Sequence, residues 1–413
     1  MSVPRPTGGG MLFLLAAAAA LGTAFMNVGL ITALVASAMA AWVVSGFLLA
    51  WFAAAGYEVR REPMQEGHCL GKTDLPLIIR NRTFLWRQPG VITESLDFAG
   101  GGRTDWELPA LGPHETIRLK REITAVKRGH FHLEKIQLIS GDPCGLFQVR
   151  KTFRLPGEIM IFPLIRPLES LPLGSSGTLS LTGDGRPLGH AGPGNDFFGV
   201  RPYRPGDEIR YIHWRMSASK QKLMVREFEA SVMERVVLIL DTDARLVGLD
   251  PVESNFEALV SLAASITEYF AAQYCGLTFF AYFNGNLMQI NGDAAGIRFK
   301  VQELLTEIRP SENRVEQLLT EVQENLPRGT TLYLLSMSDP PELKKMLTFL
   351  EDQDIRLEWI CAAKEYFPFV SEDEPMEMVL PAPDQCFPQV FGPRLLTFQT
   401  HWKELFRNEI ADL

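Results

Sequence analysis

Residues 201–229 read RPYRPGDEIRYIHWRMSASKQKLMVREFE, and a continuous apolar run, VVLIL, follows at 236–240. The Pro-Gly pair at 205–206 is strong turn chemistry. Asp207 stands where its carboxylate can accept the free amides of a new helical turn. The pattern therefore predicts a turn, a short helix that begins one residue later, and then a buried strand.

The same segment carries aromatic and basic side chains at helical spacing. Arg210 lies three residues after Asp207, close enough to pair with it, and Tyr211 and Trp214 share a face at i, i+3. Two interpretations remain open. In the first, the segment is a structural connector whose Trp214 fills the edge of a core; in the second, it is a surface that binds a partner.

The segment resembles the signature of a bacterial family known as domain of unknown function fifty-eight. That signature reads roughly R-x-Y-x-x-G-D-x-x-R-x-I-x-W, followed by a basic Ser-Ala segment and V-x-E. His213 departs from it, because members usually carry an acid there. The matching positions are Arg201, Tyr203, Gly206, Asp207, Arg210, Ile212, Trp214, Ser217, Ala218, Val225 and Glu227.

A second match lies upstream. Residues 127–131 (KRGHF) and 142–147 (DPCGLF) are similar to the basic-Gly-aromatic and D-P-F-G-L-F elements of the same family. The resemblance implies a membrane-anchored protein that works with a MoxR-type AAA+ ATPase and a transglutaminase-like membrane protein. It also implies a scaffold or adaptor role in the assembly or maturation of cell-envelope or other protein complexes.

The start of the chain predicts a membrane anchor. Residues 6–57 contain no charged side chain, whereas one membrane-spanning helix needs roughly 20 apolar residues. A break near 26–29 divides the run into two spans, at about 11–26 and 30–52. We therefore expect a short N-terminal tail (1–10) and a hairpin of two transmembrane helices within 11–56.

A cleaved signal peptide is the alternative, since residues 11–20 could form its apolar region. The second long apolar segment and the thin basic region before the first argue against cleavage. Arg5, Arg60 and Arg61 flank the hairpin, and its turn carries no positive charge. The positive-inside rule then predicts a protein of the bacterial inner membrane whose soluble domains face the cytoplasm.

The net charge and the cysteine pattern disfavour some classes of function and of site. The 413 residues include 40 Lys and Arg but 49 Asp and Glu, a net charge of −9, which disfavours nucleic-acid binding as the main role. The five cysteines are odd in number and have no C-x-x-C or Cys/His ligand spacing. A disulfide framework and a zinc site are therefore not expected.

Residues 66–165 show the alternation of a β-rich domain. Apolar and polar residues alternate at 75–82, 116–123 and 131–139, with Gly- and Pro-rich turns between them, which favours an immunoglobulin-like β-sandwich. Residues 166–200 are rich in glycine but contain no phosphate-binding motif, and we assign them to a linker.

Residues 235–400 follow the family signature segment (201–234) and predict an α/β domain. Continuous apolar strands that alternate with helices indicate a mainly parallel sheet covered on both faces. The expected strands are 236–240, 277–283, 331–336 and 357–362, and the expected helices are 255–273, 298–308, 315–326 and 343–350.

This order resembles a von Willebrand factor A-type domain, whose metal site uses D-x-S-x-S after the first strand, a Thr from a loop and an Asp after a later strand. Such hard oxygen ligands suit Mg²⁺. Here the first element reads Asp-Thr-Asp-Ala-Arg at 241–245, so both serine positions are lost and the guanidinium of Arg245 could replace the cation. The weak metal candidates are Asp241, Asp243, Ser311 and Asp339.

No nucleophile or metallohydrolase motif occurs in the sequence, and we assign no catalytic residue. The sequence predicts a binding scaffold without a cofactor. The alternative is a Mg²⁺-dependent hydrolase that uses the carboxylates at the strand ends.

Overall fold

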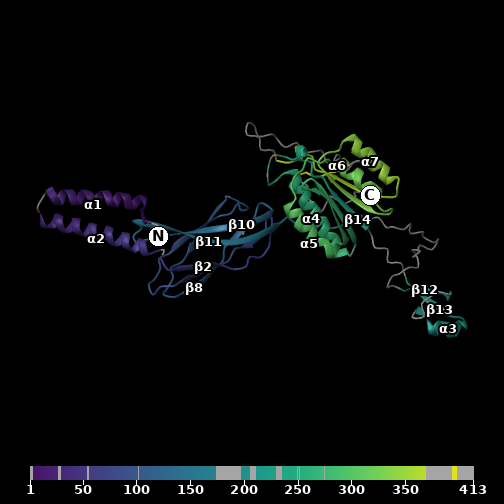
Figure 1. The fold of residues 1–413 in the computed structure, drawn as a ribbon, viewed down its shortest axis with the longest axis horizontal. Helices are drawn as coiled ribbons and strands as arrows, with labels where there is room; N and C mark the ends of the chain where they lie inside the picture. Colours follow the sequence, from purple (N-terminus) through teal and green to yellow (C-terminus); the bar gives the residue numbers. More distant parts are fainter. Residues whose placement is uncertain are drawn as a thin grey trace, which may run out of the picture. The chain divides into compact units, whose positions relative to one another are not determined.

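The computed structural model forms two compact units, Met1–Leu164 and Ile165–Leu413, and each is described by itself (Figure 1). The structure describes residues 3–26, 29–53, 55–100, 102–173, 197–204, 211–228, 235–248, 250, 252–273, 275–368 and 393–397.

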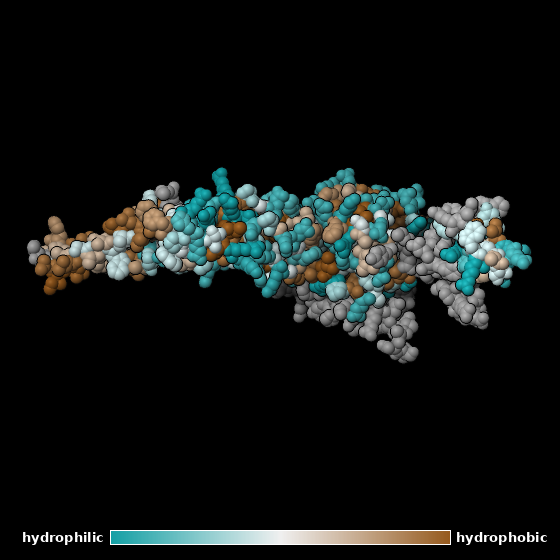
Figure 2. All heavy atoms as spheres, turned by 90° about the horizontal axis from the view of Figure 1, so that it is seen from below, coloured by the Kyte–Doolittle hydropathy of each residue, from teal (hydrophilic) through white to brown (hydrophobic). Residues whose placement is uncertain are grey.

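Two apolar helices open the first unit, α1 (Gly8–Met26) and α2 (Leu30–Ala53). Only 11% and 17% of their most apolar windows are buried, and Figure 2 shows this part of the unit as largely hydrophobic surface. At 1.5 Å per residue they extend about 29 and 36 Å, whereas the hydrocarbon core of a bilayer is about 30 Å thick. The two predicted apolar helices are therefore confirmed, and both are long enough to cross a membrane.

The rest of the first unit is built from antiparallel strands. The largest sheet has the order β1-β11-β10-β6-β7, with β3 parallel to β11, and smaller sheets are β2-β5-β8 and β4-β9. The strands are β1 (Arg5–Pro6), β2 (Tyr57–Arg61), β3 (Gly67–His68), β4 (Lys72–Asp74), β5 (Leu77–Asn81), β6 (Gly90–Ser95), β7 (Arg103–Leu108), β8 (Thr116–Leu119), β9 (Glu122–Thr124), β10 (Gly129–Gly141) and β11 (Phe147–Phe162).

Alternating residues of two sheets meet in one core. Leu77 and Ile79 of β5 pack in the same buried cluster as Ile92 of β6 and Ile136 of β10. The single strand expected over 116–123 is instead two, β8 and β9. The Asp74 carboxylate accepts the backbone amide of Arg121 between them (2.9 Å), which ends the β8 ladder at that point.

A buried ionic group crosslinks these sheets. Glu94 accepts hydrogen bonds from Arg61 and from Arg121, each at 2.6 Å, and all three side chains are at most 5% exposed. Arg121 also donates from Nε to the carbonyl of Leu75 (2.7 Å) and lies 4.6 Å from the centre of the Trp106 ring. Burial lowers the pKa of Arg121, and the charge of Glu94 opposes that shift.

The second unit contains a mixed sheet of order β16-β15-β14-β17-β18-β19. All neighbouring pairs are parallel except β15 and β16, which are antiparallel. The strands are β14 (Arg235–Leu240), β15 (Gly276–Phe283), β16 (Asn286–Asp293), β17 (Thr331–Ser336), β18 (Arg356–Cys361) and β19 (Arg394–Leu395). The expected helices correspond to α4 (Asn255–Gln273), α5 (Ala294–Glu307), α6 (Val315–Val322) and α7 (Pro341–Glu351).

Strand β16 is absent from the sequence prediction, which expected a mainly parallel sheet. Its signal is the Asn284-Gly285 pair, and both residues have positive φ (51° and 80°). An Asn-Gly pair in that conformation makes a two-residue hairpin turn. The chain therefore folds straight back on β15 and adds an antiparallel edge.

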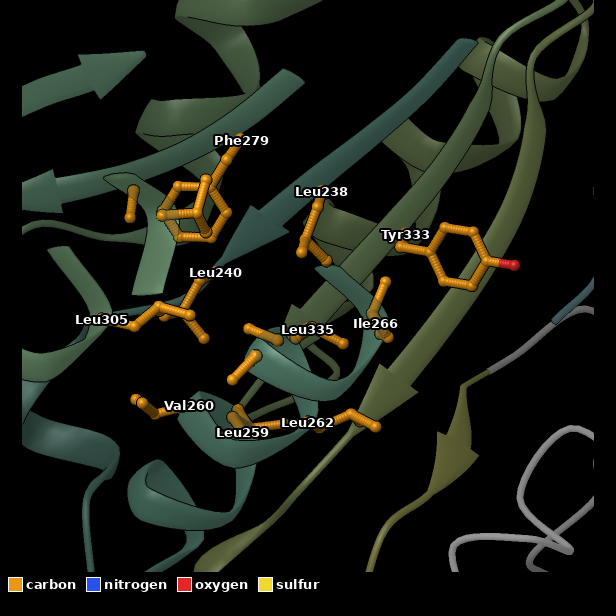
Figure 3. Packing of buried hydrophobic residues seen from close by; sticks show 14 of the residues in the cluster. Leu238, Leu240, Leu259, Val260, Leu262, Ile266, Phe279, Leu305, Tyr333 and Leu335 are labelled. Atoms are coloured by element: carbon orange, nitrogen blue, oxygen red, sulfur yellow. The ribbon is translucent and has the colours of Figure 1, made fainter. Parts of the chain in front are cut away.

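Both faces of the sheet are covered by helices. Leu238 and Leu240 of β14 point to the cluster formed with α4 and α5, and Val237 and Ile239 point to the cluster formed with α6 and α7. Figure 3 shows the first cluster, in which Leu238 and Tyr333 lie with Ile266 of α4. This two-sided burial is why β14 reads as an uninterrupted apolar run.

The predicted linker (166–200) differs from the structure at both ends. Leu171 is only 6% exposed and belongs to the α4/α5 cluster. The Pro172 carbonyl accepts the Tyr333 hydroxyl at 2.5 Å, and the Arg166 amide donates to Ser265 Oγ at 2.9 Å. The segment up to residue 173 is thus packed on the α/β unit. Residues 174–196 lie outside the described residues, and β12 (Phe197–Pro202) begins before the predicted end.

Replacing Glu94 by Ala should destabilise the first unit by about 3–5 kcal/mol, because two buried guanidinium groups lose their counter-charge. Hydrogen exchange of the β6 and β10 amides in the full chain in detergent would measure the change. The control is Glu62→Ala, whose partner Arg118 is 58% exposed and whose pair should contribute at most about 1 kcal/mol. Equal effects of the two substitutions would contradict the importance of the buried group.

Candidate functional site

Asp241 lies at the carboxyl end of β14, where ligand sites of open α/β sheets form. Its side chain is buried, and both of its carboxylate oxygens accept backbone amides: Oδ1 from Asp243 and Oδ2 from Met337, each at 3.0 Å. Met337 directly follows β17, the parallel neighbour of β14. The carboxylate therefore ties the ends of the two central strands together.

Burial raises the pKa of Asp241 to about 6, because the charged form is poorly solvated at this position. The two amide hydrogen bonds lower the pKa, but by less than burial raises it. The negative charges of Asp243 and Glu316 add to the upward shift.

Asp243 is paired with a guanidinium. Arg245 donates from Nε to Oδ1 at 2.8 Å and from Nη2 to Oδ2, and its own backbone amide reaches Oδ1 at 3.1 Å. The Asp243 side chain is 6% exposed, whereas that of Arg245 is 51% exposed. The guanidinium thus covers the outer side of the carboxylate that a cation would approach.

Ser311 comes from the loop after α5 and joins this group. Its Oγ lies 2.8 Å from Oγ1 of Thr242, its amide donates to the Thr242 carbonyl (2.6 Å), and its carbonyl accepts the Ala244 amide (2.7 Å). The structure therefore places Ser311 beside Asp243, as an isolated parallel bridge between the two residues also records.

Asp339 follows β17 and is exposed. Its charge adds to burial in raising the pKa of the Cys361 thiol to about 12. Within the part of the chain that the structure describes, no three Asp, Glu, His or Cys side chains are grouped to hold a metal ion. Of the four weak metal candidates, Asp241, Asp243 and Ser311 thus belong to one hydrogen-bonded group. The fourth, Asp339, is an exposed carboxylate outside it.

Sequence reasoning missed Glu316. It lies in the first turn of α6, and its charge acts on both Asp241 and Arg245. An acidic residue in the first helical turn is common on electrostatic grounds alone, so the sequence offered no reason to assign Glu316 to the strand ends.

The family signature forms a separate small motif. Strand β12 pairs antiparallel with β13 (Met224–Phe228), and α3 (Trp214–Lys220) precedes β13. Gly206, Asp207 and Arg210, and with them the predicted helix start, lie outside the described residues. The described helix begins at Trp214 because the Nδ1 atom of His213 accepts the Met216 amide at 3.2 Å. The residue that departs from the signature is therefore the helix cap.

Three signature residues hold this motif together. Ser217 is 8% exposed; its Oγ accepts the Met224 amide at 2.8 Å and donates to the His213 carbonyl at 3.0 Å. Ile212 and Val225 are buried and form a bridge with each other. Arg201 and Tyr203 are half-buried. Arg201 lies opposite Val225 in the strand pair, and the backbone amide of Tyr203 donates to the Leu223 carbonyl.

Trp214 is 65% exposed, together with Met216 (37%) and Leu223 (47%). Among the described residues it fills no core edge, which favours the partner-binding interpretation of Trp214 over the connector. We call these three exposed side chains of the motif the Trp214 patch. The same short motif also exposes basic side chains: Arg204, Arg215, Lys220, Lys222 and Arg226.

The upstream motif 142–147 packs on the two N-terminal helices. The Asp142 carboxylate accepts the amides of Phe147 (2.6 Å) and Cys144 (3.0 Å), and Gly145 has a φ of +71° that closes the turn. Leu146 and Phe147 then form a buried cluster with Ala50 and with side chains of both helices. This turn fixes the strand-rich part of the first unit to the helical hairpin.

Comparison with known proteins agrees with the signature. Residues 199–336 match the family described as "Protein of unknown function DUF58". Over these residues the chain belongs to the DUF58 family. The upstream motif 142–147 lies outside the matched residues, so its assignment to the family stays a prediction.

A curated relative is "Uncharacterized protein YeaD" of Bacillus subtilis (strain 168), 26% identical over 151 residues. The match covers 37% of this chain and 35% of the relative, so the chain spans about a third of that protein.

Two solved structures show only slight likeness. A late embryogenesis abundant (LEA) protein gives a TM-score of 0.19 at 13% identity, over 30% of this chain and 86% of that one. A GH20 exo-β-N-acetylglucosaminidase from Vibrio harveyi gives 0.17 at 9% identity, over 75% of this chain and 57% of that one. Neither score supports an inference about fold or function.

Mg²⁺ should bind the full chain in detergent no more tightly than about millimolar, because Asp241 is bonded to amides and Arg245 repels a cation from Asp243. Isothermal titration calorimetry should give a flat trace. Micromolar binding that disappears in Asp241→Ala would overturn this account and favour the Mg²⁺-dependent hydrolase.

The raised pKa of Asp241 predicts a pH dependence of stability. The folded state binds the Asp241 proton more tightly than the unfolded state does. Protonation therefore stabilises the fold, and this stabilisation is fully present below about pH 4 and is lost as pH rises through about 6. A shift of about two pKa units corresponds to about 3 kcal/mol. Asp241→Asn removes this titration, and hydrogen exchange of the β14 and β17 amides should then vary less between pH 4 and 7 than in the wild type.

The matched control is Asp293→Asn. This exposed carboxylate caps α5 through the Gly296 amide, and Asn is an equally good cap. If both variants keep the pH dependence of the wild type, Asp241 is not its source.

Proposed function

We propose that this chain is a membrane-anchored scaffold or adaptor that binds a protein partner through the Trp214 patch. The observation that carries the proposal is the 65% exposure of Trp214 on a motif fixed by the buried Ser217. Trp is the residue type most enriched at binding hot spots. A rigid support lowers the entropic cost of presenting it to a partner.

The chemistry of the partner follows from the surroundings of the patch. Basic side chains on the same motif, such as Arg215 and Lys222, are exposed, although the whole chain carries a net charge of −9. A complementary surface would offer an apolar pocket for Trp214 with carboxylates around it. The family resemblance proposes a MoxR-type AAA+ ATPase as this partner, with a transglutaminase-like membrane protein as a further component.

The two apolar helices support the anchoring part of the proposal. They leave most of their side chains exposed, which suits lipid and not a soluble core. With Arg5, Arg60 and Arg61 at the same end of the hairpin, we propose an inner-membrane protein whose soluble domains face the cytoplasm.

We also propose that the strand-rich part of the first unit is an immunoglobulin-like β-sandwich and that the α/β part of the second unit is a von Willebrand factor A-like domain. The shared core of the two sheets supports the first assignment. The second is supported by a doubly wound sheet, in which the first strand is central and the order reverses beside it. The Asp243–Arg245 pair then represents a metal site whose cation has been replaced by a side chain, which favours a scaffold over a Mg²⁺-dependent hydrolase.

Trp214→Ala should weaken binding of the full chain to a purified MoxR-type AAA+ ATPase by about 30-fold or more, since a hot-spot tryptophan contributes at least about 2 kcal/mol. Biolayer interferometry with the chain in detergent would measure the affinity. The melting temperature should stay unchanged, because the side chain is exposed.

Phe349→Ala is the matched control. Phe349 is an equally large aromatic residue, 56% exposed on α7 and outside the signature motif. Equal affinity of the two variants would place the binding site elsewhere. A loss of melting temperature in Trp214→Ala as large as that in Ile212→Ala, which removes a buried side chain, would make Trp214 a structural residue.

A further inference from the structure

The loop between β5 and β6 exposes three large apolar side chains in a row. Phe84 is 76% exposed, Leu85 51% and Trp86 71%. We call these residues the Phe84–Trp86 tip. Isolated apolar residues are normal on a protein surface, but a contiguous exposed group marks a surface that contacts protein or lipid.

The backbone of this tip is held by a buried asparagine. Asn81 is fully buried; its Nδ2 donates to the carbonyls of Leu85 (2.7 Å) and Gly112 (2.8 Å), and its Oδ1 accepts the amide of Thr83 (3.0 Å). The Asn81-Arg82-Thr83 tripeptide, which has the pattern of a glycosylation sequon, is therefore a structural element. The tip side chains are exposed on a fixed loop.

A second set of hydrogen bonds joins the tip to the end of α2. Arg87 is 5% exposed; its Nη1 donates to the Phe52 carbonyl at 2.5 Å and its Nη2 to Thr83 Oγ1 at 2.8 Å. The Arg82 amide donates to the Gly56 carbonyl at 2.8 Å. A cation at the last carbonyls of a helix is favourable. These bonds place the tip level with the final turn of α2.

That level corresponds to a membrane surface. At 24 residues, α2 is about 36 Å long, some 6 Å more than the roughly 30 Å of hydrocarbon. Its last turn therefore reaches the interfacial layer, where tryptophan and other aromatic side chains are favoured. The tip exposes apolar side chains next to residues that are bonded to this end of α2, so lipid suits it better than a protein partner.

We propose that the Phe84–Trp86 tip inserts into the interfacial layer of the bilayer beside the end of α2. With Arg87 as the link, the inserted tip gives the strand-rich part of the first unit a second contact with the membrane and sets its orientation there. This inference rests on the proposed membrane anchoring. It holds for either side of the membrane, because both ends of a helical hairpin face the same side.

Depth-dependent fluorescence quenching of the full chain in liposomes tests the proposal. Cys69, Cys144 and Cys386 are replaced by Ala, and the buried Cys275 and Cys361 remain. A new cysteine is then introduced by Phe84→Cys and labelled with a small fluorophore. Lipids that carry bromine atoms at shallow or deep positions of the acyl chain serve as quenchers.

Two further variants bracket the measurement. Val44→Cys reports on a residue within α2 that is 58% exposed. Glu134→Cys reports on an exposed position of β10, eight residues before the turn at Asp142, or roughly 27 Å along the strand. The label at 84 should be quenched several-fold more by shallow than by deep bromines, the label at 44 mainly by deep bromines, and the label at 134 by neither.

The outcomes separate the two proposals. If the label at 44 is quenched but the label at 84 behaves like that at 134, the tip does not contact lipid and the inference is wrong while the anchoring stands. If the label at 44 is not quenched, the membrane anchoring itself fails. If purified ATPase protects the label at 84 from aqueous iodide more than lipid does, the tip is a protein contact and the lipid assignment is overturned.

Discussion

The α/β unit depends on one constraint, the burial of β14 on both of its faces. Leu238 and Leu240 pack under α4 and α5, and Val237 and Ile239 pack under α6 and α7, so none of these four side chains points to water. Beyond the buried strand, the backbone amides need hydrogen-bond acceptors. Asp241 accepts two of these amides, and one of them belongs to Met337, directly after β17. The end of the strand is thereby a buried polar site.

This arrangement explains why a carboxylate-rich strand end need not be a metal site. Both carboxylate oxygens of Asp241 accept backbone amides, and Asp243 is paired with the guanidinium of Arg245. The negative charge that an ion would balance is balanced by a side chain of the same chain. The unit keeps the doubly wound sheet, and the binding role that we propose lies in the separate β12-α3-β13 motif, where Trp214 is exposed.

In the first unit, the strand-rich part is attached to the two apolar helices by specific contacts. The turn at 142–147 packs Leu146 and Phe147 against the helices, and Arg87 donates to the Phe52 carbonyl in the last turn of α2. Two short polar networks, built around Asp142 and Asn81, make these contacts rigid. Orientation at a membrane would then be a property of this domain and not of the helices alone.

The sequence alone determined the elements that periodicity and length reveal. It predicted both apolar helices, the β14 strand, the whole of α4 and the alternation of strands and helices after residue 234, because each has a long, one-sided or fully apolar pattern. The loss of both serine positions at 241–245 also suggested that the guanidinium of Arg245 could replace a cation. The structure pairs Arg245 with Asp243, and the replacement of a metal ion stays a prediction. The DUF58 signature was likewise recognisable from the sequence alone.

Only the tertiary structure decided how residues far apart in the chain meet. The packing of residues 165–173 on the α/β core, the contribution of Glu316 and Met337 to the Asp241 site, and the bond from Arg87 to Phe52 all join distant segments, and no local pattern encodes them. Exposure was decided there as well: the sequence left the surroundings of Trp214 open, and only the folded chain shows that Trp214 and Trp86 are 65% and 71% exposed. Burial is a property of what surrounds a side chain, which the side chain's own identity does not specify.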